Sequence, residues 1–587
     1  QFFPFFPPPP APEKKWGAGL AGVGMPAAAT EGPPTPPAEF RKHIDDEFVA
    51  KGSEKPAWGN RFAILNDLGP IAAFICSNYN IPFDNNQFAS KAKLLLKKAR
   101  EQIGWMYETT HSDGKTKGTI NYTVWSEIFI CPECGSRLNF VKETLDPNTK
   151  RTKERFPCSN CSTDLTKDAL ERDFETFVNP VTATTWKRVR FVPAIINYNV
   201  GKDTFEKLPD NFDLKLLEKI AALQMPPEMP TVAFPIEQMP HGSRLAPKGF
   251  THVHHLFLPR ATQALAILWR LASAETDVRL RNMLLFFIEQ AIWTMSLLNR
   301  YRPTGFSQVN QYLTGVYYVP SQNAEPSPWY VLDGKAKRLE KAFARRMKAG
   351  TTMTQTGTCS SIAIANDSID YIFTDPPFGE NIFYADLNFL IESWHRVLTK
   401  TSEEAIVDPA RQKDTQTYQA AMRACFGEYF RVLKPGRWIT IVFSNSANAI
   451  WRSIQEALGT AGFVVADVRT LDKQQGSYRQ VTSTAVKQDL VISAYKPTKT
   501  LAAQFALGDS TPDAAWAFVT EHLRRCPVFV QHDQTADVVA ERTAQVLHDR
   551  TVAFHVQRQL SVPLSTSEFL TGLQQRYSER DGMYFLP

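Results

Sequence analysis

The sequence lacks a long hydrophobic run. Its richest apolar stretch, Met283 to Leu298, carries Glu289 and Gln290 in the middle, so no segment reaches the roughly 18 apolar residues of a membrane-spanning helix. The first residues also lack an initiating Met and the charged-then-apolar layout of a signal peptide. We therefore expect a soluble, cytoplasmic protein without a membrane partner.

Cysteine is scarce as well, with eight among 587 residues, too few for a secreted disulfide framework. Four of them form two Cys-x-x-Cys pairs, and two such turns can present four thiolates to a tetrahedral Zn²⁺ ion. A redox site needs only one pair. We therefore predict a structural zinc site, in a reducing compartment, that is formed by Cys131, Cys134, Cys158 and Cys161.

Positive charge is in only mild excess, with a net charge of +6, which permits nucleic-acid binding without requiring it. A local cluster is formed by Lys91, Lys93, Lys97, Lys98 and Arg100. A second is formed by Lys335, Lys337, Arg338, Lys341, Arg345, Arg346 and Lys348. Each could equally be the solvated face of a helix.

Four histidines, His241, His252, His254 and His255, lack the spacing of metal ligands and are interpreted as ordinary polar side chains.

Strand and helix patterns alternate at several places. An apolar run at 62–65 ends in Asn66-Asp67 before a helical stretch at 71–79, and a second short strand at 370–374 ends at Asp375. A third unit is a helix through 429–433, a Lys-Pro-Gly turn at 434–436 and a strand at 438–443. Such alternation predicts an α/β fold with a Rossmann-like, doubly wound, mainly parallel sheet, whose ligands bind at the carboxyl ends of its strands.

The domain organisation follows from the length between these units. About 300 residues separate Asp67 from Asp375, too many for one crossover connection. We predict a proline-rich, disordered segment at 1–40, with eleven prolines in its first 37 residues, and a sheet domain divided between 41–80 and 351–500. The insertion at 81–350 would hold the zinc ribbon, at about 125–170, and a helical, target-recognition part. Residues 501–587 would form a helical accessory region.

The motif Asp375-Pro376-Pro377-Phe378-Gly379 follows a predicted strand. An exocyclic amine of a nucleobase is a poor nucleophile because its lone pair is delocalised into the ring. The Asp375 carboxylate and the backbone carbonyl at Pro376 could accept its two N–H groups and so favour the pyramidal, attacking nitrogen. Proline would hold that carbonyl rigidly, and Phe378 could stack on a flipped base.

With this motif, the chain resembles the amino-group methyltransferases that use S-adenosylmethionine and carry an Asp/Asn/Ser-Pro-Pro-aromatic motif. It looks most like the large zinc-ribbon-containing DNA methylases that are described as adenine-specific. The resemblance runs through Ser368 to Phe389, and its companion stretches are Ala63 to Pro70, Arg431 to Gly436 and Leu471 to Tyr478.

The resemblance implies roles for particular residues. Asp375, Pro376, Pro377 and Phe378 would hold the target base, and Asp67 would accept hydrogen bonds from the ribose hydroxyls of S-adenosylmethionine. Ser360, within the segment 356–361, would line the adenine ring of the cofactor. The family's glycine-rich first motif has a counterpart in Gly22 and Gly24, where Ala18 replaces the usual acid.

The expected activity is methylation of adenine N6 in DNA. The basic segment from Lys335 to Lys348 and the zinc ribbon are expected to contact the duplex. A restriction or defence-system protein is a further expected partner. Two alternatives stay open: methylation of cytosine N4 or of an RNA amino group, and a catalytically silent nucleic-acid-binding subunit.

Overall fold

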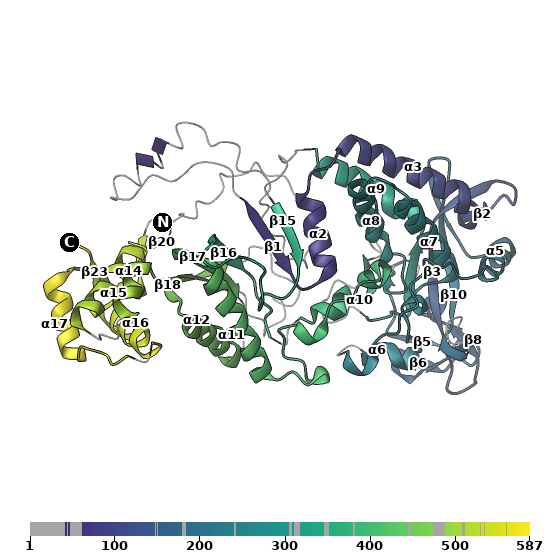
Figure 1. Cartoon of the computed structure of the whole chain (residues 1–587). Coiled ribbons are helices and arrows are strands. Elements are labelled where there is room, and N and C mark those ends of the chain that lie inside the picture. Colours follow the sequence, from purple (N-terminus) through teal and green to yellow (C-terminus); the bar gives the residue numbers. More distant parts are fainter. Residues whose placement is uncertain are drawn as a thin grey trace.

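The computed structural model describes most of the chain after Arg61. The described residues are 42–43, 45–46, 62–146, 148–149, 151–178, 184–239, 242–303, 308–309, 317–344, 352–379, 382–443, 448–472, 488–506, 511–528, 530–532, 535–558 and 560–587. Within these ranges, no helix combines the length and apolarity that crossing a bilayer requires. Figure 1 shows the C-terminal helices at one end of an elongated molecule, the parallel strands in the middle and the large insertion at the other end.

A parallel pair of strands lies in the middle of the molecule. Strand β1 (Ala63–Asp67) pairs with β15 (Thr352–Thr356), so that Asp67 lies opposite Thr356 at the carboxyl end. Helix α2 (Pro70–Asn80) follows β1 directly. The strand, acidic end and helix expected from the pattern around Asp67 are therefore confirmed.

The second sheet has four strands in the order β16-β17-β19-β18. They are β16 (Ile369–Thr374), β17 (Leu433–Phe443), β18 (Val464–Asp472) and β19 (Gln488–Tyr495). Strand β16 is parallel to β17, and β19 is antiparallel to both of its neighbours. The Lys-Pro-Gly segment expected as a turn lies inside β17, where Gly436 has a φ of 76° and the pairing with β16 shifts register.

Helices α11 (Thr415–Val432) and α12 (Asn448–Ala461) pack against this sheet. Their buried side chains, among them Phe426 and Ile454, form one core with Ile439 and Ile441 of β17. Helix α11 is capped by Asp414, whose carboxylate accepts a hydrogen bond from the Thr417 N–H at 2.8 Å. This core fixes β16 and the loop that follows it.

Within the described residues, the parallel strands form two separate sheets. Strand β1 pairs with β15 alone and β16 with β17 alone, so each has one edge without a partner strand there. On β16, Tyr371 and Phe373 are 51% and 54% exposed, although parallel sheets usually have both faces covered. The α/β class is thus confirmed, whereas one continuous doubly wound sheet is not seen in the described part.

The insertion contains a large antiparallel sheet, where the sequence predicted a zinc ribbon and helices. Nine strands are arranged around β3 (Lys117–Ile130), with the main order β11-β10-β3-β14-β12-β13. The other strands of that order are β10 (Phe191–Val200), β11 (Asp203–Lys207), β12 (Asn299–Arg300), β13 (Gln308–Val309) and β14 (Gln322–Pro326). Three short strands also pair with β3: β2 (Glu108–Thr110), β4 (Arg137–Asn139) and β7 (Glu171–Arg172).

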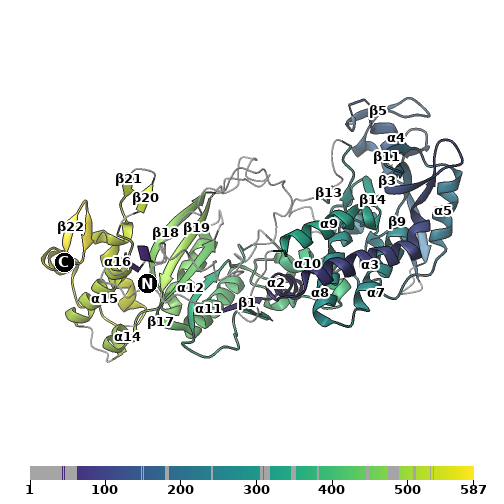
Figure 2. The same ribbon diagram turned by 90° about the horizontal axis from the view of Figure 1, so that it is seen from above.

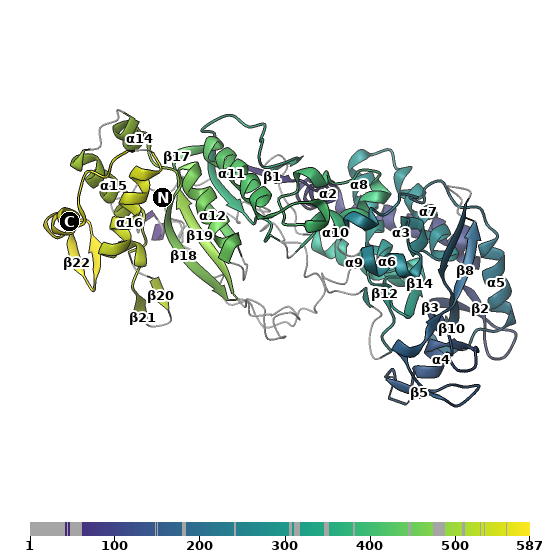
Figure 3. The same ribbon diagram turned by 90° about the horizontal axis from the view of Figure 1, so that it is seen from below.

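Two hairpins and two short helices complete the insertion outside its large helices. Strands β5 (Arg155–Pro157) and β6 (Asp164–Thr166) form one hairpin, and β8 (Phe174–Val178) and β9 (Thr185–Val189) form the other. The short helices are α4 (Phe140–Thr144) and α6 (Gly242–Leu245). Figure 3 shows β5 and α4 at the far edge of the insertion.

The large helices of the insertion share one apolar core with the middle of the molecule. They are α3 (Asn85–Ile103), α5 (Asn211–Ala221), α7 (Pro259–Ser273), α8 (Val278–Ile292) and α9 (Pro328–Ala342). The core also includes Ile71 of α2 and Trp394 of α10 (Tyr384–His395). In addition, His395 of α10 forms a hydrogen bond with the buried Glu289 of α8. The insertion is therefore packed tightly onto α2 and α10.

The C-terminal region is formed by helices and two hairpins (Figure 2). The helices are α14 (Lys499–Ala506), α15 (Pro512–Arg525), α16 (Ala544–Val556) and α17 (Thr566–Arg576). The hairpins pair β20 (Val530–His532) with β21 (Thr535–Asp537) and β22 (Ser578–Arg580) with β23 (Met583–Phe585). Val464 and Tyr495 of the four-stranded sheet belong to the same core as Phe518 and Phe554, so this region covers part of that sheet.

Candidate functional site

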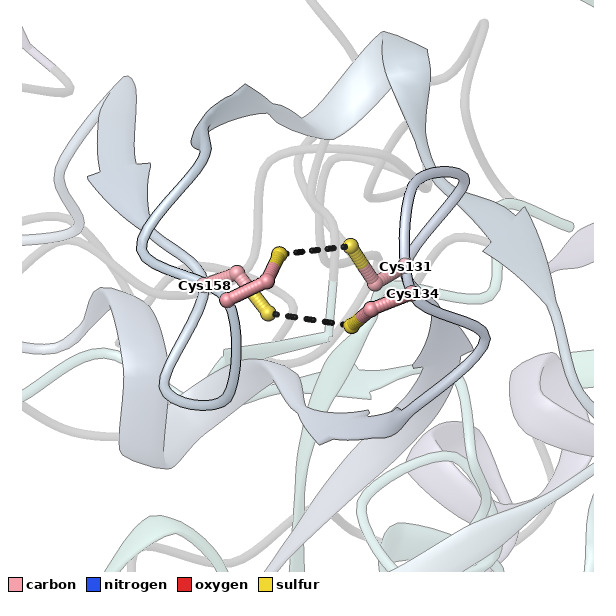
Figure 4. A group of neighbouring side chains, drawn as sticks. Cys131, Cys134 and Cys158 are labelled. Atoms are coloured by element: carbon pink, nitrogen blue, oxygen red, sulfur yellow. Dashed lines mark hydrogen bonds between the residues drawn. The ribbon is translucent and has the colours of Figure 1, made fainter.

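The four paired cysteines lie on two turns of the same construction. In the first, which follows β3, the Cys131 N–H donates to the Ser136 carbonyl at 2.9 Å. In the second, between β5 and β6, the Cys158 N–H donates to the Thr163 carbonyl at 2.8 Å. Gly135 and Ser162 occupy equivalent positions and have φ values of 69° and 61°. The two turns face each other across the four sulfurs (Figure 4).

The sulfur positions suit a tetrahedral metal ion. The Cys131 and Cys161 sulfurs are 3.8 Å apart, as are those of Cys134 and Cys158, and all four lie within 4.8 Å of one another. A tetrahedron with Zn–S bonds of about 2.3 Å has edges of about 3.8 Å. A hydrogen bond with the Ser136 hydroxyl also lowers the pKa of Cys134, to about 6. The cluster is therefore compatible with Zn²⁺, and it is the only such ligand cluster in the described ranges.

Among the described residues, His252, His254 and His255 do not belong to a metal-ligand cluster. His254 and His255 are buried, and the two nitrogens of the His254 ring have no hydrogen-bond partner among the described residues. Burial, with the neighbouring histidines and Arg188, lowers the pKa of His254 to about 4 and that of His255 to about 2. His255 stacks on Trp186 with ring centroids 3.4 Å apart. These neutral rings serve packing, and His241 lies outside the described residues.

The Asp-Pro-Pro-Phe motif lies where the sequence placed it, directly after β16. Asp375 is exposed at the carboxyl end of the strand, and Pro376 is buried behind it. Phe378 is half-buried and packs edge-on against Phe443 of β17, with ring centroids 5.3 Å apart. The motif thus combines an accessible carboxylate with a backbone held by the core of the four-stranded sheet.

A buried tyrosine holds the loop of this motif. The Tyr418 hydroxyl, on α11, donates a hydrogen bond to the Pro377 carbonyl at 2.8 Å, and the Tyr418 side chain is fully buried. At the end of the loop, the Val407 N–H donates to the Gly379 carbonyl at 3.4 Å. The Pro377 carbonyl, which accepts the hydrogen bond from Tyr418, is adjacent in the chain to the Pro376 carbonyl. This contact therefore also constrains the direction of the Pro376 carbonyl.

The two described residues expected to bind the cofactor lie at the end of the other parallel pair. Asp67 ends β1, and its Oδ1 accepts a hydrogen bond from the Gly69 N–H at 2.7 Å. Ser360 lies in the turn after β15, where its hydroxyl is 2.9 Å from that of Thr358. The Asp67 carbonyl accepts the Gly357 N–H at 2.9 Å, which joins this turn to β1. Gly22 and Gly24 lie outside the described residues.

The Asp67 side chain is accessible, but the surrounding protein shifts the pKa of its carboxyl group. Desolvation raises the pKa of Asp67, and the hydrogen bond from Gly69 opposes this shift. Gly69 itself is needed for close packing, because a Cβ at this position would lie 2.8 Å from Nδ2 of Asn388 on α10. The start of α2 and the side of α10 are therefore in direct contact beside Asp67.

Tyr384, the first residue of α10, lies within electrostatic range of both acidic strand ends. Burial and nearby carboxylates raise the pKa of its hydroxyl to about 12, and those carboxylates belong to Asp375, Asp67 and Glu404. Glu404 also accepts a hydrogen bond from the Ala385 N–H at 3.0 Å, which fixes the beginning of α10. Asp67 and Asp375 are therefore both close enough to the Tyr384 hydroxyl to affect it electrostatically.

A second set of contacts links the β1–β15 pair to the four-stranded sheet. The Asn66 side chain donates to the Cys359 sulfur at 3.1 Å, and Cys359 also interacts with the Tyr429 hydroxyl. That hydroxyl lies 3.3 Å from the hydroxyl of Thr374, the last residue of β16. The carboxyl ends of β1 and β16 are thus linked through Cys359 and Tyr429.

Sequence reasoning missed Tyr384, Tyr418 and Cys359. Tyr384 lies inside the stretch that carries the family resemblance, so its position in that stretch was an available signal. Tyr418 acts through one backbone carbonyl that lies far from it in the sequence, and Cys359 is one of the four cysteines outside the Cys-x-x-Cys pairs. Neither has a local pattern that distinguishes it from a core residue.

Comparison with known proteins identifies one part of the chain. Residues 369–536 match the model of a family described as DNA methylase, of N6 and N4 type. This match begins at β16 and includes the Asp-Pro-Pro-Phe motif. No curated protein matches the chain.

Several solved structures resemble limited parts of the chain. An S-adenosylmethionine-dependent methyltransferase from Methanosarcina mazei is 14% identical, with 28% of this chain and 79% of that chain covered and a TM-score of 0.16. A candidate DNA modification methylase from Thermus thermophilus is 13% identical, with 29% and 68% covered and a TM-score of 0.15. Its complex with S-adenosylmethionine is 15% identical, with 28% and 65% covered and a TM-score of 0.15. TM-scores of this size support no argument about this chain.

Proposed function

We propose that this chain is a DNA methyltransferase that transfers the methyl group of S-adenosylmethionine to the exocyclic N6 amine of adenine. The observation that carries the proposal is the position of Asp375 and Pro376 at the carboxyl end of a parallel strand. This strand lies in the segment that matches the DNA methylase family. The proposal extends that match to a particular base and a particular set of residues.

In the proposed reaction, the Asp-Pro-Pro-Phe loop holds the target amine. The Asp375 carboxylate accepts one N–H of the amine, and the Pro376 carbonyl accepts the other. With both hydrogens held, the nitrogen lone pair is directed out of the base plane toward the methyl group. The hydrogen bond from Tyr418 to Pro377 keeps the loop in position. No strong base is needed, because the proton can leave after the transfer.

The methyl donor would bind at the end of the β1–β15 pair. The carboxylate of Asp67 is accessible there, beside the turn that carries Ser360, and acidic residues in such a position hold ribose hydroxyls in nucleotide-binding sheets. S-adenosylmethionine supplies an already activated methyl group on its sulfonium. Gly22 and Gly24 are proposed to allow close approach of the backbone to the cofactor. Tyr384, whose hydroxyl is affected by the charges of both Asp67 and Asp375, is proposed to line the space where donor and acceptor meet.

The zinc site has a structural role in this proposal. Cys131, Cys134, Cys158 and Cys161 would fill all four positions of a tetrahedral ion, which leaves no open position for a substrate or water. The ion would hold the two turns together at the edge of the insertion. In this proposal, the parallel strands hold the flipped base and its methyl donor, away from the metal.

Replacement of Asp375 tests the assignment. We expect Asp375→Ala to lower methyl transfer to duplex DNA by about 100-fold or more, since a hydrogen bond made in the transition state is lost. The matched control is Asp370→Ala on the same strand, where an exposed carboxylate pairs with Lys434 at 2.9 Å; it should retain activity. Equal turnover by the Asp375→Ala variant and the unmodified protein would refute the role of Asp375.

The product decides between the proposed base and its alternatives. Mass spectrometry of nucleosides after incubation with DNA and with RNA should show N6-methyladenine from DNA. Detection of N4-methylcytosine, or of a methylated RNA nucleoside, would identify cytosine or RNA as the substrate instead of adenine in DNA. The amino-group chemistry would be the same. Calorimetric titration with S-adenosylmethionine separates these outcomes from a silent nucleic-acid-binding subunit, which would show neither cofactor binding nor product.

A further inference from the structure

The first basic cluster of the sequence lies on α3, and the described part of the second cluster lies on α9, which packs against α3. Arg345, Arg346 and Lys348 of the second cluster lie outside the described residues. The Arg100 guanidinium of α3 lies over the Trp329 ring of α9, 4.7 Å from its centroid. At the other end of the pair, the Asn85 side chain donates to the Glu340 carbonyl at 3.0 Å. The end of α3 therefore meets the beginning of α9, so the two helices are antiparallel. Figures 1 and 2 show them side by side on the outside of the insertion.

Most of the basic side chains on this pair are exposed. Helix α3 carries five basic residues and one acidic residue, and α9 carries four basic and two acidic. The two helices together thus have as much net positive charge as the whole chain, +6. We call the following exposed residues the basic strip: Lys93, Lys97, Lys98, Arg100, Lys337, Arg338 and Lys341.

Few ion pairs within the protein neutralise the positive charge of the basic strip. Among the described ion pairs, none involves a strip residue, whereas the neighbouring Lys91 pairs with Glu275 at 2.8 Å. Because the helices are antiparallel and rise about 1.5 Å per residue, the strip extends for about 20 Å from Lys341 to Arg100. Duplex DNA carries one negative charge per roughly 1.7 Å of its axis. The strip would therefore follow the backbone along about six base pairs.

We propose that the basic strip of α3 and α9 binds the phosphate backbone of a nucleic-acid duplex. This inference rests on the proposed function, for which it names the surface that receives the substrate. The strip would contribute affinity and orientation without reading base sequence, since phosphate contacts carry no direct sequence information. The sequence placed duplex binding on the second cluster and the zinc ribbon, whereas the structure joins the first cluster to the second.

Two features favour a duplex over other polyanions. An amphipathic helix that lies on a membrane inserts an apolar face into the lipid, but the apolar face of α3, which includes Phe88, Leu95 and Ile103, is buried in the core. Single-stranded nucleic acid is usually held by stacking on several aromatic rings. On these two helices, Tyr330 is the only described aromatic side chain that is exposed, at 43%.

The test compares two triple variants of the full chain. The strip variant is Lys97→Gln, Arg338→Gln and Lys341→Gln. The control is Lys202→Gln, Lys215→Gln and Arg580→Gln, which neutralises three exposed basic residues elsewhere. Glutamine has nearly the helix propensity of lysine and arginine, so the helices should remain intact. Binding to a 30-base-pair duplex is measured at several salt concentrations for both variants and the unmodified protein.

We expect the strip variant to lower the slope of log K against log salt by about 0.9 for each lost phosphate contact, or about 1 to 3 in total. Affinity at low salt should fall at least about 10-fold, and the control should behave as the unmodified protein. An unchanged slope and affinity in the strip variant would overturn the proposal. The proposal would also be overturned if the unmodified protein bound phosphatidylserine vesicles but not the duplex, and the strip variant lost this vesicle binding.

Measurement of methyl transfer together with duplex binding, in the unmodified protein and in both triple variants, separates this inference from the proposed function. If the strip variant loses duplex binding although no methyl transfer is found in any variant, the surface is supported and the proposed function fails. If methyl transfer occurs and its salt dependence is the same with and without the strip, the function is supported and the surface fails.

Discussion

A metal-binding measurement on the four-cysteine cluster gives the sharpest test of the insertion. The sulfur pairs at 3.8 Å are the edges of a tetrahedron whose centre lies about 2.3 Å from each corner, the usual Zn–S distance. We therefore expect one zinc ion per chain by elemental analysis. X-ray absorption at the zinc edge should give four sulfur neighbours at about 2.3 Å.

The size of the local core predicts what removal of the metal will do. The apolar cluster around the sulfurs has three buried side chains besides the cysteines: Leu138, Phe156 and Leu165. Each contributes about 1.5 to 3 kcal/mol when fully buried. Binding of a structural zinc contributes about 10 to 16 kcal/mol at neutral pH. The metal would therefore stabilise this part of the insertion more than the three apolar side chains do together.

Cys158→Ser is the corresponding variant, with Cys425→Ser as the control because Cys425 lies on α11, far from the cluster in the fold. We expect the first to lose zinc and the second to retain it. Chelation of the unmodified protein should make the chain susceptible to proteolysis between 131 and 170. A metal-free protein that resists cleavage in this segment, or a disulfide between the two turns, would refute the reasoning.

Two further predictions concern single side chains. Tyr418→Phe keeps the ring but leaves the Pro377 carbonyl without its partner, at a cost of about 1 to 3 kcal/mol; kcat should fall by up to about 100-fold with little change in KM. Tyr577→Phe, which removes a hydroxyl contact of 2.8 Å with Thr520, is the control, and equal kcat in both variants would contradict a positioning role. The lowered pKa of His254 means that the folded state binds fewer protons than the unfolded state, so stability should fall between about pH 6.5 and 4, by about 1.4 kcal/mol per pH unit. His254→Leu should leave stability at pH 7 unchanged or higher and reduce this slope in thermal unfolding; an undiminished slope would count against the assignment.

The features predicted correctly from the sequence depend on short stretches. The strand before Asp375 and the helix after Asp67 were identified because apolar periodicity and turn residues act locally. The four-cysteine cluster was identified because each turn is complete within a few residues. In these cases the chemistry and the local backbone are encoded together.

The features that were missed depend on contacts between distant segments. Strands β3 and β10 pair although the four-cysteine segment lies between them in the sequence, and no local pattern in either strand specifies its partner or register. The role of Tyr418 likewise depends on one contact with a backbone carbonyl. The joining of the two basic clusters required the packing of α3 against α9, which neither cluster indicates by itself.

The insertion begins and ends at one place, since the rings of Phe83 and Phe343 lie 5.0 Å apart just outside α3 and α9. A segment with adjacent ends could in principle be excised or exchanged as a module. Its apolar interior, however, continues into α10 through Trp394, and α10 begins with Tyr384, which lies within electrostatic range of both acidic strand ends. A chimaera that transplants this segment from a relative would therefore have to carry a matching inner face of α10 with it, or the position of Tyr384 in the proposed site would change as well.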